Sequence, residues 1–216
     1  MFSEIAKALE KQLGEPLPGM IGQGKMRPYL PAAPHMDFPE SKTARESAVL
    51  ALLYQKQDEP HILLIERNIY KGAHSGQISL PGGKLELSET HKDAAVRETL
   101  EEVGIDKKNY DIIGELSKIY VAASDFNIQP IVAVTEKPLI IHPDVREVAQ
   151  ILETPLSYFF EMERRKQKLI QNAMGLELMA PYFDVHDKTL WGATAMILSE
   201  LTEIIQASPQ NYIKYR

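Results

Sequence analysis

Residues 82–105 read GGKLELSETHKDAAVRETLEEVGI, two glycines and a short polar loop followed by a pattern typical of one helix. The helix is expected to begin near Thr90, because Asp93 stands three residues later and can complete a capping box with it. It is expected to end at Gly104, because glycine adopts the left-handed conformation that follows many helices. The segment therefore predicts a loop-helix unit with a defined start and end.

Three glutamates of this helix, Glu98, Glu101 and Glu102, are spaced by three and four residues, so their carboxylates share one face. Like charges at that spacing destabilise an isolated helix by roughly 0.2–0.5 kcal/mol per pair. A divalent cation among them would offset this cost, and Mg²⁺ prefers carboxylate, water and phosphate oxygens. For three glutamates alone, a solvated acidic face is the competing interpretation.

The wider pattern resembles the signature of Nudix hydrolases, G-x5-E-x7-R-E-U-x-E-E-x-G-U, where U is a bulky aliphatic residue. The matching positions are Gly83, Glu89, Arg97, Glu98, Glu101, Glu102, Gly104 and Ile105. Thr99 departs from the first U position, but its methyl group can still pack. So many fixed positions at the right spacing favour a metal site over a solvated face. The resemblance implies an α/β (α+β) fold, the Nudix α/β/α sandwich, with a mixed β-sheet and a loop-helix metal site.

The resemblance also implies roles for the helix residues. Glu98 and Glu102 would be the principal ligands of Mg²⁺ or Mn²⁺, and Glu101 would be a further ligand or would act through water. Arg97 would orient the carboxylates through a bidentate ion pair, with Glu89 as its expected partner. The metal would neutralise charge on a diphosphate and lower the pKa of an attacking water. The catalytic candidates on the helix are thus Arg97, Glu98 and Glu101.

Two glycines and one distant glutamate complete this candidate set. Gly82 and Gly83 would allow the backbone to approach the metal and the diphosphate closely. Glu147 is a further catalytic candidate, because a carboxylate outside the helix can assist the metal or the water in this superfamily. Its alternative role is a helix N-terminal charge favoured by the helix dipole.

The preceding residues, 63–83, read LLIERNIYKGAHSGQISLPGG and resemble the additional signature of coenzyme A diphosphatases, L-L-T-x-R-[SA]-x3-R-x3-G-x3-F-P-G-G. The matching positions are Leu63, Leu64, Arg67, Gly76, Pro81, Gly82 and Gly83. The departures are Ile65, Asn68, Gly72 and Leu80. Glycine at position 72 matters most among them, because it removes a guanidinium that could contact phosphate. The likeness to this subfamily extends from about Ala48 to Leu201.

Three residues of this stretch are candidates for substrate binding, together with Gly82 and Gly83. Arg67 suits a phosphate or a carboxylate of the helix, because its planar fork can bind either with two hydrogen bonds. Its alternative is a surface charge at a strand end. His74 could instead hydrogen-bond its own loop, and Gln77 could orient a backbone carbonyl.

These likenesses favour a Nudix diphosphatase, a hydrolase acting on phosphoric anhydrides. The preferred substrate is coenzyme A or an acyl-CoA, cleaved to 4′-phosphopantetheine and adenosine 3′,5′-bisphosphate with Mg²⁺ or Mn²⁺. ADP-ribose, NADH or another dinucleotide is the alternative that the departures at positions 72 and 80 keep open. A catalytically silent Nudix domain that senses nucleotides is a third interpretation, and the complete set of glutamates argues against it.

Secondary structure follows from periodicity and from turn residues. Residues 3–13 predict an amphipathic helix, and the dense prolines of residues 14–39 predict an extended arm. Two runs of β-formers at 48–54 and 62–65 predict a hairpin around the turn at 57–60. The remaining expectations are strands at 78–80, 112–121 and 127–134, a helix or irregular segment at 147–158, a hairpin at 177–191 and a helix at 193–206. Trp191 is expected in the core rather than beneath an adenine ring.

Composition limits the partners and the location. The 216 residues carry a net charge of −6 without a long basic run, which argues against a nucleic-acid polymer as partner. The chain has no cysteine, so thiolate chemistry and disulfides are excluded. No secretory signal and no membrane span are evident, so we expect a cytoplasmic protein without a membrane partner. The expected partner is a small nucleoside diphosphate derivative, and a homodimer is compatible with the sequence. The expected organisation is a helix and Pro/Gly-rich arm at 1–45, a Nudix domain at 46–207 and a tail at 208–216.

Overall fold

The computed structural model describes residues 2–34, 39–69, 75–172 and 174–207, and its centre is a mixed sheet. β1 (Arg45–Lys56) and β2 (Glu59–Arg67) form the predicted antiparallel hairpin. The tight turn between them uses the left-handed conformation at residues 57 and 58. β7 (Phe126–Thr135) runs parallel to β1, which makes the sheet mixed, as predicted.

Shorter strands extend this sheet and carry the glycine-rich loop onto it. β3 (Ile78–Ser79) pairs with β2, and β4 (Gly82–Lys84) pairs with β1. The single strand predicted at 112–121 is two strands, β5 (Asp111–Glu115) and β6 (Ile119–Val121), and both pair with β7. The pairing of β4 with β1 matters most for function, because it fixes both glycines of the loop to a long central strand.

The helix or irregular segment predicted at 147–158 is wrong for most of its length. Residues 148–155 form β8 (Val148–Pro155), which pairs antiparallel with β2. The register shifts opposite Glu66 and Arg67, so one residue of β8 is inserted as a bulge. This bulge breaks the alternation expected of a strand and leaves Val148, Ile151 and Leu152 at a spacing that imitates a helix.

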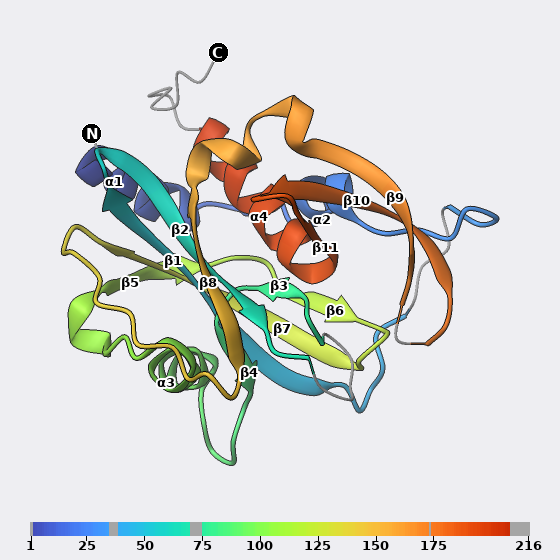
Figure 1. The fold of residues 1–216 in the computed structure, drawn as a ribbon, viewed down its shortest axis with the longest axis horizontal. Coiled ribbons are helices and arrows are strands. Elements are labelled where there is room, and N and C mark those ends of the chain that lie inside the picture. The colour runs from blue at the N-terminus through green and yellow to red at the C-terminus, as the bar shows by residue number, and fades with distance from the viewer. Residues whose placement is uncertain (1, 35–38, 70–74, 173, 208–216) are drawn as a thin grey trace.

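Helices cover both faces of the sheet, as the alternating side chains of β1 require. Residues 48, 50, 52 and 54 pack in one hydrophobic cluster with α3 (His91–Val103). Residues 51 and 53 face the other cluster, which contains α4 (Gly192–Ala207). Figure 1 shows the strands crossing between α3 and α4. The predicted sandwich is therefore present.

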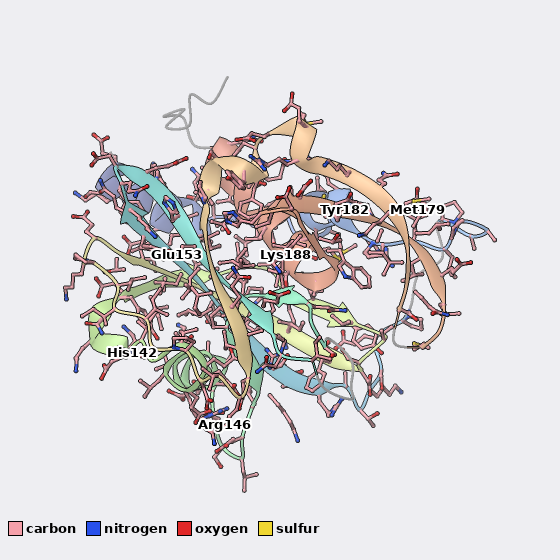
Figure 2. The ribbon with its side chains drawn as sticks, viewed as in Figure 1. His142, Arg146, Glu153, Met179, Tyr182 and Lys188 are labelled. Atoms are coloured by element: carbon pink, nitrogen blue, oxygen red, sulfur yellow. The ribbon has the colours of Figure 1, made fainter. Side chains whose placement is uncertain are left out.

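A second, three-stranded sheet lies beside α4. Its strands are β9 (Arg165–Gln171), β10 (Glu177–Val185) and β11 (Lys188–Trp191). The hairpin predicted at 177–191 is confirmed by β10 and β11, whereas β9 was not expected. Lys188, labelled in Figure 2, forms an ion pair of 2.9 Å with Glu66 of β2 and so joins the two sheets. The other short helices are η2 (Lys107–Asn109), η3 (Leu156–Phe159) and η4 (Met162–Arg164).

The N-terminal segment packs into the same core. α1 (Phe2–Leu13) buries Phe2 and Leu9 in the cluster around α4, and Met26 joins them from η1 (Gly24–Met26). The arm predicted as extended also contains a helical turn, α2 (Met20–Gln23). In the described part of the chain no helix is both long enough and apolar enough to cross a membrane. The division at residues 45 and 207 stays a prediction.

Candidate active site

α3 has the start and the end that its sequence predicts. The Thr90 hydroxyl accepts a hydrogen bond from the Asp93 amide at 3.2 Å, and the Asp93 carboxylate accepts one from the Thr90 amide. Gly104 ends the helix with φ +70°, and a side chain there would meet His142. Thr99 is buried, and its hydroxyl donates to the Ala95 carbonyl at 2.7 Å. Threonine can therefore occupy this aliphatic position of the motif, because its buried hydroxyl has a hydrogen-bond partner.

Arg97 organises the carboxylates on the exposed side of this helix. Its Nε and Nη2 donate to the two oxygens of Glu89 at 2.8 and 3.0 Å, which is the predicted bidentate pair. Its Nη1 donates to Glu98 Oε1 at 2.8 Å and to Glu101 Oε2 at 3.1 Å. The Lys84 carbonyl accepts a further bond from Nη2, so the guanidinium also ties the helix to β4. One cation thus holds three glutamates in place.

Glu102 is the buried member of the glutamate set, with none of its side chain exposed. The Gly82 amide donates to its Oε2 at 2.9 Å. Arg67 Nη1 lies 3.0 Å from its Oε1, but no described residue donates a hydrogen bond to that oxygen, so the contact is an ion pair without hydrogen-bond alignment. The pKa of Glu102 is raised to about 7, mainly by burial and also by the charges of Glu98 and Glu147, while Arg67 and the Gly82 amide lower it.

Glu98 lies against the backbone of β4. A side-chain carbon placed on Gly83 would come within 2.3 Å of Glu98 Oε1, so any larger residue there would displace the Glu98 carboxylate. Burial also raises the pKa of Glu98, while Arg97 lowers it and the charges of Glu101 and Glu147 raise it. Gly82 is equally constrained, because a carbon on it would meet the backbone of β1 at 2.3 Å. The close approach predicted for both glycines is present.

Glu147 belongs to a loop that caps the end of α3. The amides of His142 and Asp144 donate to the carbonyls of Val103 and Glu102 at 2.9 and 3.0 Å. The Asn68 amide donates to the Glu147 carbonyl at 2.8 Å, one residue after Arg67. Glu147 is exposed, and its charge acts on both Glu98 and Glu102. A loop rather than a helix therefore places this carboxylate, which corrects the alternative role considered for it.

The carboxylate oxygens at the end of α3 and in the adjoining loop are suitable ligands for a divalent cation. Glu98, Glu102 and Glu147 offer carboxylate oxygens, and the charge of Glu147 raises the pKa of both Glu98 and Glu102, so a positive charge among them would be favourable. One oxygen of Glu102 is buried and accepts no hydrogen bond from the part of the chain that the structure describes. Glu101 is 57% exposed and is turned toward Arg97. Among the described residues, no group of three or more His, Asp or Glu side chains is arranged to hold a metal ion. Mg²⁺ commonly binds through only one or two carboxylates and keeps several waters.

A cavity of about 400 Å³ opens beside these residues. Arg67, Gln77, Gly82 and Gly83 all line it, so four of the five substrate-binding candidates are brought together. The fifth, His74, lies outside the described residues. The Arg67 amide donates to the Gln77 carbonyl at 3.0 Å, which closes the base of the loop between them. Trp191 also lines the cavity and is only partly buried, so its predicted place in the core is wrong.

The cavity walls contain residues that the motifs did not reveal. Apolar side chains from β6, β7, β10 and α4 form most of its surface; these include Ile119, Val121, Ile128, Leu178, Met196 and Ile197. Arg27 and Lys84 add two cations to Arg67. Only the basic character of these two residues could have suggested them, because neither stands in a recognised pattern.

A mixed sheet between helices, with an acidic loop-helix on one of its faces, defines an α/β/α sandwich. The family model described as "NUDIX domain" matches residues 44–170. An uncharacterized Nudix hydrolase, NudL, of Enterobacter sp. (strain 638) is 32% identical over 171 residues, which are 76% of this chain and 85% of that protein. The chain belongs to the Nudix hydrolase family. The predicted fold and family are confirmed, whereas the preference for coenzyme A stays a prediction.

Two further similarities add detail. Nudix hydrolase 22, chloroplastic, of Arabidopsis thaliana is 29% identical over 197 residues, which are 84% of this chain. The match spans only 64% of the plant protein's own length. The crystal structure of a Nudix hydrolase from M. smegmatis, RenU, aligns with a TM-score of 0.55 at 19% identity over 77% of this chain and 88% of that one. At that identity the likeness concerns the fold alone.

Proposed function

We propose that this protein hydrolyses the diphosphate bond of a nucleoside diphosphate joined to a second moiety, using Mg²⁺ or Mn²⁺. The preferred substrate is coenzyme A or an acyl-CoA, and the products are 4′-phosphopantetheine or its acyl form and adenosine 3′,5′-bisphosphate. The observation that carries this proposal is the position of Gly82 and Gly83. They touch the carboxylates of Glu102 and Glu98 on one side and line the cavity on the other.

Each residue of the site has a role that its contacts support. Glu98 and Glu102 would hold the metal, with Glu101 or Glu147 as the further carboxylate. When bound, the metal supplies positive charge to the diphosphate and lowers the pKa of a water. Arg97 keeps Glu98 in place through its contacts with Glu89 and Glu98. The glycine backbone leaves room for the diphosphate at the cavity edge.

Two residues beside the glycines would act on the substrate and on the water. Arg67 sets its positive charge at the cavity wall while pairing with Glu102. Glu147 is the exposed carboxylate that can accept a proton from the attacking water. The oxygen of that water forms a bond to one phosphorus as the bridging P–O bond breaks. One proton of the water passes to the base, and the other stays on the phosphate that the water has joined. The leaving phosphate keeps the electron pair of the broken P–O bond.

The test is a substrate panel with purified protein and Mg²⁺ or Mn²⁺. Coenzyme A should give a higher kcat/KM than ADP-ribose, NADH or a dinucleotide, and dephospho-coenzyme A should be poorer than coenzyme A. Equal or better turnover of ADP-ribose would replace coenzyme A with the alternative substrate class. Binding of these nucleotides without any hydrolysis would instead favour a sensing domain.

A further inference from the structure

The charge of the cavity differs from that of the whole chain. Among the described residues that line it, three are cations, Arg27, Arg67 and Lys84, and none is an aspartate or a glutamate. The chain as a whole has a net charge of −6. A concave wall with one sign of charge concentrates ligands of the opposite sign, so this cavity suits an anion.

The three cations come from two separate parts of the fold. Arg67 and Lys84 end β2 and β4, beside the glutamates of α3. Arg27 comes from the N-terminal arm, directly after η1, which packs against α4 and β10. Apolar residues of β6, β10 and α4 form much of the wall that includes all three. Arg27 therefore reaches the cavity from a different part of the chain than the two cations beside the glutamates.

The arm that carries Arg27 is held by a buried carboxylate. Glu200 of α4 is fully buried, and it accepts hydrogen bonds from the Gly19 amide at 3.0 Å and from Gln23 Nε2 at 2.9 Å. The Ser117 amide is a third donor at 3.4 Å. A buried carboxylate is costly unless it is satisfied by hydrogen bonds, so these contacts fix the arm where it lies. They position the arm and do not touch the cavity.

Further contacts fix the arm on both sides of Arg27. Before it, Ser199 Oγ donates to the Gly22 carbonyl at 2.7 Å, and Lys25 pairs with Glu203 at 2.6 Å. After it, Tyr29 and Met179 exchange two backbone hydrogen bonds of 3.0 and 2.9 Å. Figure 2 labels Met179 on the sheet beside the arm. Because the backbone is fixed before binding, a ligand that contacts Arg27 loses little free energy to ordering the chain.

We propose that Arg27 determines substrate specificity by binding a phosphate monoester separate from the diphosphate that is cleaved. This inference rests on the proposed diphosphatase function and narrows its substrates to nucleoside diphosphate derivatives that bear such an extra phosphate. A guanidinium suits this role, because its planar fork binds two phosphate oxygens at once. The 3′-phosphate of coenzyme A has this chemistry.

A binding measurement tests the inference without relying on turnover. The affinities of adenosine 3′,5′-bisphosphate and of AMP are measured by calorimetry on the full chain. The wild type should bind the bisphosphate about 10-fold more tightly or better, the size expected when a charged group gains hydrogen bonds. Arg27→Gln should remove this preference while leaving the affinity for AMP unchanged, and Arg27→Lys should restore part of it.

Lys25→Gln is the matched control. It removes the same charge two residues away, from a side chain that pairs with Glu203 and does not line the cavity. This variant should keep the preference for the bisphosphate, and the thermal midpoint of each variant shows that it folds. The inference is overturned if Arg27→Gln weakens both nucleotides equally, if Lys25→Gln has the same effect as Arg27→Gln, or if the wild type shows no preference.

Hydrolysis then separates this inference from the proposed function. The ratio of kcat/KM for coenzyme A to that for dephospho-coenzyme A should fall toward one in Arg27→Gln. Turnover of coenzyme A with a ratio that Arg27→Gln leaves unchanged would overturn the role of Arg27 and keep the diphosphatase. A preference in binding that depends on Arg27, without hydrolysis of any diphosphate, would overturn the diphosphatase and keep the role of Arg27.

Discussion

Glu102 is a residue whose charge is opposed by most of its surroundings. It is fully buried, and the nearby charges of Glu98 and Glu147 add to the cost of its ionisation. Arg67 and the Gly82 amide offset only part of this cost, so its pKa stands at about 7. A divalent cation at the same place would stabilise the ionised form. Glu102 is therefore suited to the metal-binding role proposed for it.

This balance predicts a pH dependence for the stability of the metal-free protein. Between the ordinary pKa of 4.5 and the folded value of about 7, the folded state binds more protons at Glu102 than the unfolded state does. Stability should therefore decrease as the pH rises through that window. Glu102→Gln carries no charge and should show a smaller decrease. The measurement is the thermal midpoint in chelator at pH 5 and pH 8, and equal decreases in both proteins would contradict the expectation.

The second prediction at this scale concerns turnover. Glu98→Gln and Glu102→Gln keep the shape of each side chain but remove the charge proposed to hold the metal. Each should lower kcat by about 100-fold or more while the fold is retained. Glu10→Gln is the control, because Glu10 is an exposed glutamate of α1 outside the site. Near-normal kcat in both site variants would remove these two glutamates from the metal site.

At the scale of elements, the sequence predicts those structures that depend on residues close together in the chain. α3 was predicted with its capping box and its final glycine, because both ends depend on residues a few positions apart. β8 was missed because its bulge, set by pairing with β2, disturbs the alternation of its own residues. β9 was missed because its pattern, RKQKLIQ, is polar along most of its length, and among the described strands it pairs only with β10. Errors arose where distant parts of the chain determine local structure.

The candidate site divides in the same way. The glutamates and their arginine stand within one helix, so their spacing alone brought them together. Arg67 and Gln77 were predicted from the second motif, at residues 63–83, and both line the cavity. Arg27 had no such pattern, because only the folding of the arm against α4 brings it to the cavity.

The pairing of β4 with β1 leads to a prediction for the glycines. Gly83→Ala would place a carbon within 2.3 Å of the Glu98 carboxylate, so this side chain must move away. Activity should fall at least about 10-fold, because the carboxylate leaves its position beside the cavity. Gly24→Ala is the matched control, since a carbon there meets nothing within 4 Å and the backbone is already helical. Comparable activity in the two variants would show that the close approach at Gly83 is not needed.

At the scale of the whole molecule, the positive charges of the cavity wall are separated from the negative charges of the glutamates. The acidic chain has a cavity wall that is positive among the described residues, while the glutamates lie behind the two glycines. This separation would allow the proposed anionic substrate to enter without meeting the carboxylates directly, and a cation could then lie between the two. A homodimer stays a prediction, and the features described so far lie within one chain.

The last prediction concerns the N-terminal helix as part of this whole. Leu9 of α1 is 1% exposed and packs in the cluster that also contains Met26 and the side chains of α4. Leu9→Ala should cost about 2–5 kcal/mol of stability, because it removes buried methyl groups and leaves a cavity. For a chain of this size the thermal midpoint falls by about 2–4 °C per kcal/mol. Leu87→Ala is the control, since Leu87 is 98% exposed and should change the midpoint little. If both variants have the same thermal midpoint, α1 does not contribute to the stability of the domain, which then begins near residue 46 as the sequence predicts. If only Leu9→Ala lowers the thermal midpoint, the N-terminal segment that includes Arg27 is part of the same folding unit as the hydrophobic core.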